Sequence, residues 1–250
     1  MRPVKGDWDL IRNHNRSLVI NLLRTAGPMS RSQLSRKTGL APSALTRMVR
    51  GLLQEGLVLE AGKSASRGGR RAVMLSFNPT YASTVGVKIE REQLIAARLD
   101  LAGRILEGES QPLAGARSPR QVFTQVTEVV NTLREGRLLG VGVGISGFVD
   151  AVQGVDLYSP ILGWRDVPVA SPLAERLGLP VWVENDVNAL TLAEGRYGAG
   201  QDLRDFVCIT VGEGIGAGLV IDGRLHRGRF GGAGEVGHFC LDPVGPVCRC

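Results

Sequence analysis

The sequence predicts an α/β protein with a small basic helical domain at its N-terminal end, and three observations support this. Residues 1–76 hold 14 Lys and Arg against 4 Asp and Glu, a net of +10, whereas the whole chain carries +6, so the remainder carries −4. From about residue 81 onward, strand and helix patterns alternate, as in α/β folds. Over 181–194 a strand pattern meets a polar break and then helical spacing, which is where open α/β sheets bind ligands.

The bulk composition is that of an ordinary soluble protein with two domains, expected at 1–80 and 81–250. Apolar residues make up 43% and charged residues 22% of the 250. No apolar run is long enough to span a bilayer, and residues 1–9 lack the apolar core of a signal peptide. These features predict a cytoplasmic protein with no membrane partner. Four cysteines, three of them in the last eleven residues, do not form the pattern of a disulfide framework.

The basic region contains three predicted helices in quick succession. The first is expected over 13–25. The second begins with a capping box, in which Ser30 and Gln33 have the required spacing, and it ends at Gly39. Pro42 is well placed as the first residue of the third helix. Two short helices joined by a tight glycine turn predict a helix-turn-helix.

The third helix is expected to bury one face and to present the other to DNA. The apolar residues at helical spacing are Leu45, Val49, Leu52 and Leu53. The opposite face carries the candidate DNA-contacting residues Ser43, Thr46, Arg47 and Arg50. Small polar and arginine side chains of this kind reach base edges and phosphates. The alternative is a three-helix module that docks on another protein.

A β-hairpin wing is predicted after the third helix. A short strand over 57–60 and a return strand over 73–77 flank a Gly- and Ser-rich loop that has no acidic residue. The loop supplies three further candidate DNA contacts, Arg67, Arg70 and Arg71. A solvated loop is the alternative. The charge asymmetry, the glycine turn and the wing together favour DNA binding, and the arrangement resembles the winged helix-turn-helix of bacterial regulators.

The body begins with three predicted strands, over 84–89, 94–100 and 105–109, then a helix over 121–133 and a strand over 138–145. A later strand over 179–183 stops at Glu184, Asn185 and Asp186, and a helix follows. An amide beside a carboxylate suits a polyhydroxylated ligand, because each group can hold a sugar hydroxyl. The alternative is a plain capping turn in which Asn185 or Asp186 caps the helix.

Two more patterns occupy the C-terminal part. A glycine-rich turn over 212–218 lies between predicted strands; it can bring backbone N–H groups near a phosphate, or serve tight packing. Cys248 and Cys250 stand ten and twelve residues beyond His238, so these three residues are candidate zinc ligands. The alternative for His238 is a hydrogen-bonded core histidine. Cys240 is a possible substitute ligand, and Cys208 is expected to be a small buried apolar residue.

Taken together, these motifs resemble the ROK family of repressors, open-reading-frame proteins and sugar kinases. They are Glu-Asn-Asp-x-Asn-Ala from Glu184, the Gly-x-Gly-Ile-Gly-Ala-Gly turn, and Glu-x-Gly-His from Glu235 followed by Cys-x-Cys. The resemblance implies a two-lobed, actin-like (ribonuclease H-like) fold that holds a sugar between its lobes. It implies that the sugar contacts are Asn185, Asp186, Glu235 and His238. It also implies a structural zinc that rigidifies the loop carrying Glu235 and His238.

The sequence departs from the family's kinases in two places. They carry Asp-x-Gly-x-Thr in the first hairpin, whereas this chain has Lys88–Glu92 there, with no glycine and two added acids; Glu213 also stands where a threonine is usual. Both changes oppose nucleotide binding, so Asp186, at the position of the kinases' general base, is expected to be vestigial and no residue catalytic. The family's third cysteine, a further sugar-contacting glutamate and the helices completing the second lobe would lie beyond Cys250. The resemblance therefore indicates a truncated second lobe.

The sequence thus predicts a sugar-responsive DNA-binding transcriptional regulator, a repressor of carbohydrate-metabolism genes, with a degenerate ATP site. Its expected partners are operator DNA, a small sugar effector and a second copy of the chain in a homodimer or larger homo-oligomer. The main alternative is an active ATP-dependent sugar kinase with an accessory DNA-binding head. A weaker alternative has the body bind a protein partner and keep the pocket as scaffold.

Overall fold

A computed structural model describes residues 6–63, 71–113, 118–212, 214–229, 231–245 and 247, with the main chain alone at 6–9. The chain forms two compact units, Met1–Tyr81 and Ala82–Cys250. Among the residues described, no helix is both long enough and apolar enough to cross a membrane.

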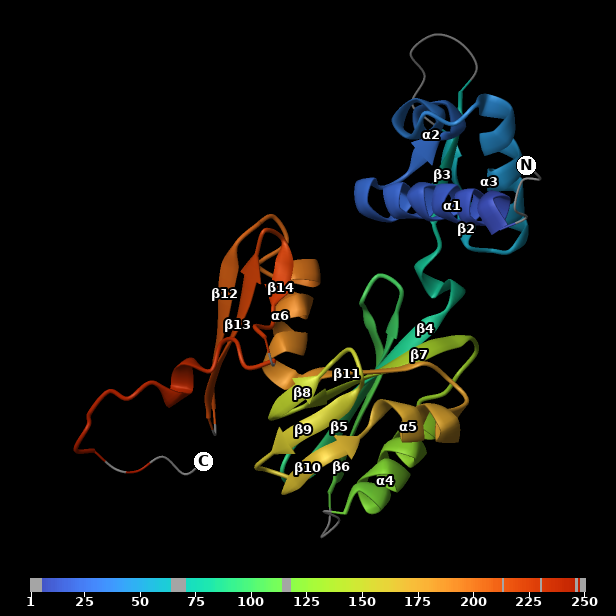
Figure 1. Ribbon diagram of the computed structural model, residues 1–250. Helices are drawn as coiled ribbons and strands as arrows, with labels where there is room; N and C mark the ends of the chain where they lie inside the picture. The colour runs from blue at the N-terminus through green and yellow to red at the C-terminus, as the bar shows by residue number, and fades with distance from the viewer. Residues whose placement is uncertain are drawn as a thin grey trace. The chain divides into compact units, whose positions relative to one another are not determined.

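The first unit is a three-helix arrangement with a small antiparallel sheet (Figure 1). Its elements are α1 (Gly6–Ala26), β1 (Met29–Ser30), α2 (Arg31–Thr38), α3 (Pro42–Gln54), β2 (Val58–Lys63), β3 (Val73–Phe77) and a 3-10 turn, η1 (Pro79–Tyr81). Strand β3 lies between β1 and β2. The fully buried side chains come from every main element: Val19, Leu34, Leu45, Val49, Leu52, Val58 and Leu75. The first unit therefore has a core of its own.

The predicted helix boundaries in this unit are confirmed at α2 and α3. The side chain of Ser30 accepts a hydrogen bond from the backbone N–H of Gln33, and the side chain of Gln33 accepts one from the backbone N–H of Ser30. Gly39 ends α2 with φ at 71°, a left-handed conformation that favours glycine. Helix α1 begins earlier than expected, at Gly6. Leu53, expected inside, is half-buried and packs against the edge of the core.

The second unit is built on a mixed five-stranded sheet of order β11-β7-β4-β5-β6. The strands are β4 (Ser83–Ile89), β5 (Gln93–Asp100), β6 (Ile105–Pro112), β7 (Leu138–Ile145) and β11 (Val181–Asn185). Strand β7 runs parallel to both β4 and β11, while β4, β5 and β6 are antiparallel neighbours. Helices α4 (Pro119–Thr132) and α5 (Ala170–Leu177) pack together beside this sheet (Figure 1). The α/β class predicted for the body is confirmed.

A second, three-stranded sheet in this unit was not foreseen. It contains β8 (Phe148–Asp150), β9 (Val155–Ser159) and β10 (Trp164–Pro168), all antiparallel. These strands are short and lack a clear alternation of apolar and polar residues, so no periodicity marks them. They nevertheless join the main core, because Val149 and Trp164 are buried with the side chains of α4.

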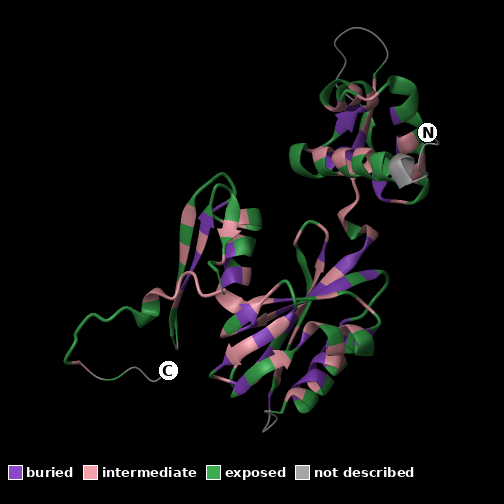
Figure 2. Cartoon of the chain, in the orientation of Figure 1, coloured by how far each residue is buried: buried purple, intermediate pink, exposed green. Residues whose placement is uncertain are grey.

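The C-terminal part contains one helix on a small antiparallel sheet. Its elements are α6 (Asp186–Tyr197), β12 (Phe206–Val211), β13 (Ile215–Ile221), β14 (Arg224–His226) and a 3-10 turn, η2 (Val236–His238). Helix α6 contacts β12 and β13. Along β12, exposed side chains alternate with half-buried ones (Figure 2). The exposed set on that strand is Val207, Ile209 and Val211.

The inward face of α6 differs from the helical apolar pattern. The fully buried residue of this helix is Thr191, with Asn188 beside it, whereas Leu190 is 42% exposed. The Thr191 hydroxyl donates to the carbonyl of Val187, so its burial leaves no donor unsatisfied. A Cβ on Gly218 would collide with the Thr191 side chain. The helix can therefore approach β13 closely only because a glycine faces it.

Candidate functional site

The first candidate surface is the exposed face of α3. Ser43, Thr46, Arg47 and Arg50 are all exposed, as expected, while Leu45 and Val49 on the opposite face are buried. A shallow hollow of about 300 Å³ between α2 and α3 is lined in part by Arg31, Arg36 and Thr46. Basic and hydroxyl groups are therefore present on both helices of the helix-turn-helix.

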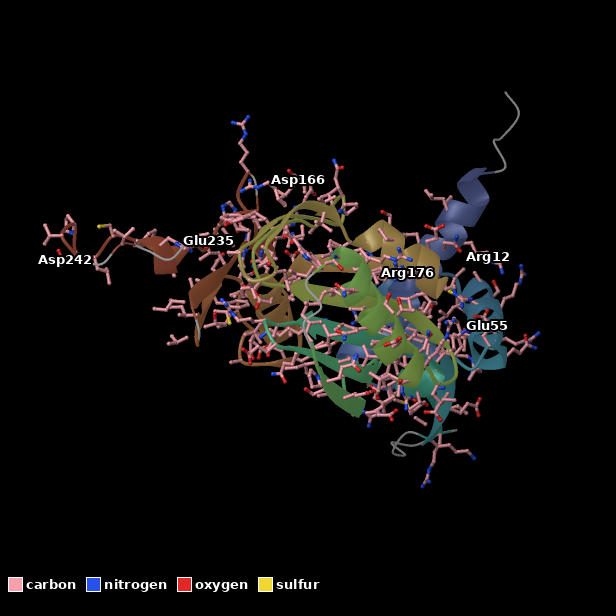
Figure 3. The ribbon with its side chains drawn as sticks, turned by 90° about the horizontal axis from the view of Figure 1, so that it is seen from below. Arg12, Glu55, Asp166, Arg176, Glu235 and Asp242 are labelled. Atoms are coloured by element: carbon pink, nitrogen blue, oxygen red, sulfur yellow. The ribbon has the colours of Figure 1, made fainter. Side chains whose placement is uncertain are left out.

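The wing is described only in part. Strands β2 and β3 pair antiparallel as the predicted hairpin requires, and Arg71 is exposed just before β3. Arg67 and Arg70 lie outside the described residues. An ion pair between Arg16 and Glu55 ties α1 to the end of α3 and helps to fix the helices that present this surface (Figure 3 labels Glu55).

The second candidate surface begins at the N-terminus of α6, where Asn185 is the cap. Its Oδ1 accepts from the backbone N–H groups of Val187 and Asn188, both at 3.0 Å, and its Nδ2 donates to the carbonyl of Gly147 at 2.9 Å. The capping interpretation left open by the sequence therefore holds for Asn185. Most of the amide's hydrogen-bonding capacity is used internally, and one N–H remains available to a ligand.

Asp186 is the first residue of α6 and lies beside the carboxyl end of β4. Its Oδ1 accepts from the backbone N–H of Val187 at 3.0 Å, and its Oδ2 lies 3.9 Å from Nζ of Lys88. Lys88 also pairs with Oε1 of Glu90 at 2.9 Å. That hydrogen bond raises the pKa of Lys88 above its ordinary value and lowers the pKa of Glu90. An ammonium group thus stands at the end of β4, next to the carboxylate at the position of the kinases' base.

The glycine-rich segment Gly231–His238 carries Glu235 and His238. Oε2 of Glu235 lies 3.4 Å from Nε2 of His238, and both side chains are partly exposed. The carbonyl of Gly234 accepts from the N–H of Ala217 on β13. A Cβ on Gly232 would lie 2.9 Å from the ring of Phe148 on β8, so the segment lies directly against that strand. Figure 3 shows Glu235 on this C-terminal segment, with Asp242 farther along it.

Three polar segments are therefore held together. Asn185 donates to Gly147, and Gly232 packs on Phe148, so the turn 146–148 links the N-terminus of α6 to the glycine-rich segment. The side chain of Glu235 lies beside that of His238. Asn185 and Asp186 are adjacent at the end of β11 and the start of α6. This arrangement offers carboxylate, amide and imidazole groups to a ligand rich in hydroxyls.

Sequence reasoning missed two pairings at this site. Nε and Nη2 of Arg227 donate to Oε2 of Glu184 at 2.8 and 2.6 Å, and Lys88 approaches Asp186. Arg227 lies in a segment without periodicity and is 43 residues from its partner, so no local pattern could signal that pair. The sequence marked Glu184 as the point where a strand ends, but it did not indicate that this residue pairs with Arg227.

The predicted zinc ligands are described in part. His238 is described, whereas Cys248 and Cys250 lie outside the described residues. Within the described part of the chain, no group of three or more His, Cys, Asp and Glu is arranged to hold a metal ion. Cys240 is exposed and Cys208, expected to be buried, is half-buried; neither forms a disulfide. Zinc binding therefore stays a prediction.

Two families match the chain. The ROK family matches residues 84–250, and the MarR family matches residues 13–60. The first match covers most of the second unit, and the second covers most of α1, all of α2 and α3, and the start of β2.

The curated relatives include sugar-named repressors. The chain is 31% identical to the N-acetylglucosamine repressor of Escherichia coli O157:H7, over 98% of this chain and 62% of that protein. It is 30% identical to the xylose repressor of Bacillus subtilis, over 98% of this chain and 65% of the repressor. The chain therefore spans less than two thirds of the length of these two relatives.

Solved structures give the same picture. A ROK family transcriptional regulator, described as a homologue of the E. coli MLC protein, has a TM-score of 0.80 and 30% identity over 96% of this chain and 62% of its own. A ROK family glucokinase from Streptomyces griseus, in complex with glucose and AMPPNP, has a TM-score of 0.60 and 37% identity over 65% of this chain and 52% of its own.

Proposed function

Because the chain belongs to the ROK family, we propose that it is a sugar-responsive transcriptional repressor that binds operator DNA upstream of carbohydrate-metabolism genes. The observation that carries the proposal is the similarity to two sugar-named repressors over 98% of this chain, including the basic first unit. A sugar kinase has no need of the exposed arginines that α3 presents.

The DNA-binding part of the proposal rests on the first unit. Arg47 and Arg50, with Ser43 and Thr46, form one exposed face on a helix whose other face is anchored in the core. We assign base and phosphate contacts to this face and phosphate contacts to the wing residues Arg67, Arg70 and Arg71. A homodimer would place two such faces on the halves of a palindrome.

The effector part rests on the N-terminus of α6 and the glycine-rich segment Gly231–His238. Asp186 keeps acceptor capacity on Oδ2, and Glu235 and His238 are partly exposed as a pair. We assign sugar hydroxyls to these three side chains and to the remaining amide N–H of Asn185. The sugar would bind one state of the protein better and so shift the population away from the DNA-bound form. Among the described residues, only His238 and the possible substitute Cys240 are candidate zinc ligands, so no part of this proposal depends on bound zinc.

The second candidate function is an ATP-dependent sugar kinase, favoured by Asp186 and by the similarity to a glucokinase. The Lys88–Glu90 ion pair at the end of β4 argues against it, because Glu90 already neutralises the ammonium group that could otherwise bind a polyphosphate there. Phosphoryl transfer depends on positioning the phosphate and neutralising its charge, and the segment 88–92 serves both less well than a glycine turn would. We therefore assign no catalytic role to Asp186.

The experiment is a gel-shift titration of the chain with fragments that carry palindromic operators and with random DNA, at moderate salt. The expected result is selective binding that changes on addition of N-acetylglucosamine, D-xylose or D-glucose. Equal affinity for operator and random DNA would contradict the proposal. Release of ADP with any of these sugars in a coupled assay would support the kinase instead.

A further inference from the structure

An ion pair joins the two parts of the candidate sugar site across 43 residues of chain. Glu184 is the penultimate residue of β11, immediately before Asn185 and Asp186. Arg227 follows β14 and precedes the glycine-rich segment Gly231–His238. Nε and Nη2 of Arg227 both donate to Oε2 of Glu184, at 2.8 and 2.6 Å. The side chain of Glu184 is 14% exposed and that of Arg227 is 41% exposed, so the carboxylate is screened by solvent less than in a fully exposed pair.

The other carboxylate oxygen of Glu184 serves the opposite side of the site. Oε1 accepts from the backbone N–H of Asn185 at 3.0 Å and from Nδ2 of Asn188 at 3.3 Å. Asn188 is 4% exposed in the first turn of α6. One carboxylate therefore holds the helix cap and Arg227 at the same time. It accepts four charge-assisted hydrogen bonds, two on each oxygen, which use its acceptor capacity fully.

The backbone of Arg227 extends this link into the glycine-rich segment. Its carbonyl accepts from the N–H of Ala233 at 3.2 Å, which ties Arg227 to the glycine-rich segment. In the same segment, the carbonyl of Gly234 accepts from the backbone N–H of Ala217 on β13. Glu235 follows directly, three residues before His238. The position of these two side chains thus depends on where Arg227 is held.

We propose that Glu184 and Arg227 are a positioning pair for the sugar effector, which fixes Glu235 and His238 relative to Asp186. The inference rests on the proposed function and adds two residues that do not themselves touch the ligand. A lysine at 227 would keep the charge but present only one nitrogen, so the arginine geometry matters as well as its charge. Loss of either partner removes the side-chain link that ties Glu184 to Arg227, so the glycine-rich segment is held less firmly relative to Asp186.

A second ion pair in the same part of the fold provides a matched control. Nη2 of Arg204 lies 2.6 Å from Oδ1 of Asp222, and the two side chains are 74% and 70% exposed. This pair links the chain before β12 to the turn after β13 and touches none of the proposed sugar contacts. Exposed pairs of this kind contribute little to stability. Arg204→Ala therefore controls for the loss of an arginine ion pair as such.

The first measurement is amide hydrogen exchange in the whole chain without ligand. Arg227→Ala, Arg227→Lys and Glu184→Gln are compared with the unmodified chain and with Arg204→Ala. We expect faster exchange in peptides covering 231–238 in the three site variants, with Arg227→Lys intermediate, and no change in Arg204→Ala. Unchanged exchange in 231–238 would overturn the inference, whether or not any sugar binds.

The second measurement is calorimetric titration with N-acetylglucosamine, D-xylose and D-glucose well below the melting temperature. We expect the unmodified chain and Arg204→Ala to bind one sugar equally, and the site variants to bind it at least 10-fold more weakly. In a double variant, the second substitution should add little to the first. Wild-type affinity in variants with faster exchange would overturn the positioning role.

A failure of the proposed function can be told apart from a failure of the inference about Glu184 and Arg227. If the unmodified chain binds none of the sugars and no operator DNA, the proposed function fails, and the assignment of this pair to a sugar site fails with it. If the unmodified chain binds a sugar and the site variants bind it equally well, only the inference fails.

Discussion

Asp156 on β9 is an exception to the rule that buried polar groups find partners. The residue is fully buried, and within the described part of the chain neither carboxylate oxygen has a hydrogen-bond partner of normal geometry. Its neighbours across the sheet are Val149 and Val167. Burial raises the pKa of Asp156 to about 7, against a weaker opposing effect of the Tyr158 backbone N–H.

This raised pKa predicts a pH dependence of stability. An unfolded Asp loses its proton near pH 3.8, whereas the folded one keeps it until about pH 7. The folded chain should therefore lose stability as pH rises through that window, by about 1.4 kcal/mol for each pKa unit, and reach its lowest level above pH 7. Asp156→Asn should remove the dependence and stabilise the chain at pH 8, as measured by urea unfolding at several pH values.

Asp100 is the matched control with the opposite sign. It is 2% exposed; burial opposes its ionisation, but hydrogen bonds from Arg104 and Ala102 outweigh this and lower its pKa. The contribution of Asp100 to the free energy of unfolding should be present above pH 3.8 and be lost as pH falls through its lowered pKa. Asp100→Asn should therefore destabilise the chain at pH 7. If Asp156→Asn also destabilised at pH 8, the carboxylate would have a partner and the interpretation would be wrong.

At the scale of elements, α6 and β13 pack at a distance that only glycine allows. Gly218 faces the buried Thr191, and a Cβ there would collide with its side chain. Gly218→Ala should lower the free energy of unfolding by about 1–3 kcal/mol, because added volume in a packed core forces side chains to move. Gly142→Ala on β7, where a Cβ would meet nothing within 4 Å, is the control. Equal effects in urea titrations would contradict this packing.

Helix α3 gives a prediction about nucleic-acid binding. Arg47→Ala and Arg50→Ala should each weaken operator binding by about 1–3 kcal/mol or reduce its salt dependence, according to whether a base or a phosphate is contacted. Arg12→Ala, an exposed arginine on α1, should leave binding nearly unchanged (Figure 3 labels Arg12). Fluorescence anisotropy at several salt concentrations separates the two kinds of contact. An effect of Arg12→Ala as large as that of Arg47→Ala would place the DNA surface elsewhere.

At the scale of the whole molecule, the proposal requires that two sites in different units be coupled. Coupling between ligands is reciprocal, so a sugar that weakens operator binding must itself bind more weakly when the operator is present. We expect a mutual effect of about 1–3 kcal/mol, measured by titrating the sugar with and without operator DNA. Asp186→Asn should abolish the sugar's effect on DNA binding but leave operator affinity unchanged. Operator binding unaffected by any sugar would contradict a regulator of this kind.

Several features followed from the sequence because their causes are local. The capping box at Ser30, the glycine end of α2 and proline at the start of α3 act within one turn of helix, and each was confirmed. The motif around Asn185 indicated a polar helix start at a strand end, and the structure has it there. The −4 net charge of the body and the +10 of residues 1–76 needed only a count.

Other features were decided by the tertiary structure alone, because they depend on residues far apart in the chain. The β8–β10 sheet pairs strands too short to show a period, and Thr191 rather than Leu190 is buried because a glycine strand faces it. The approach of Lys88 to Asp186 arises because the carboxyl ends of β4 and β11 lie at one edge of the same sheet, whereas Glu184 pairs with Arg227 because the end of β14 in a separate sheet packs near that edge. The sequence by itself indicated the family and the residue types of the candidate site, because these depend on local patterns; long-range packing decided which of those residues are tied to one another.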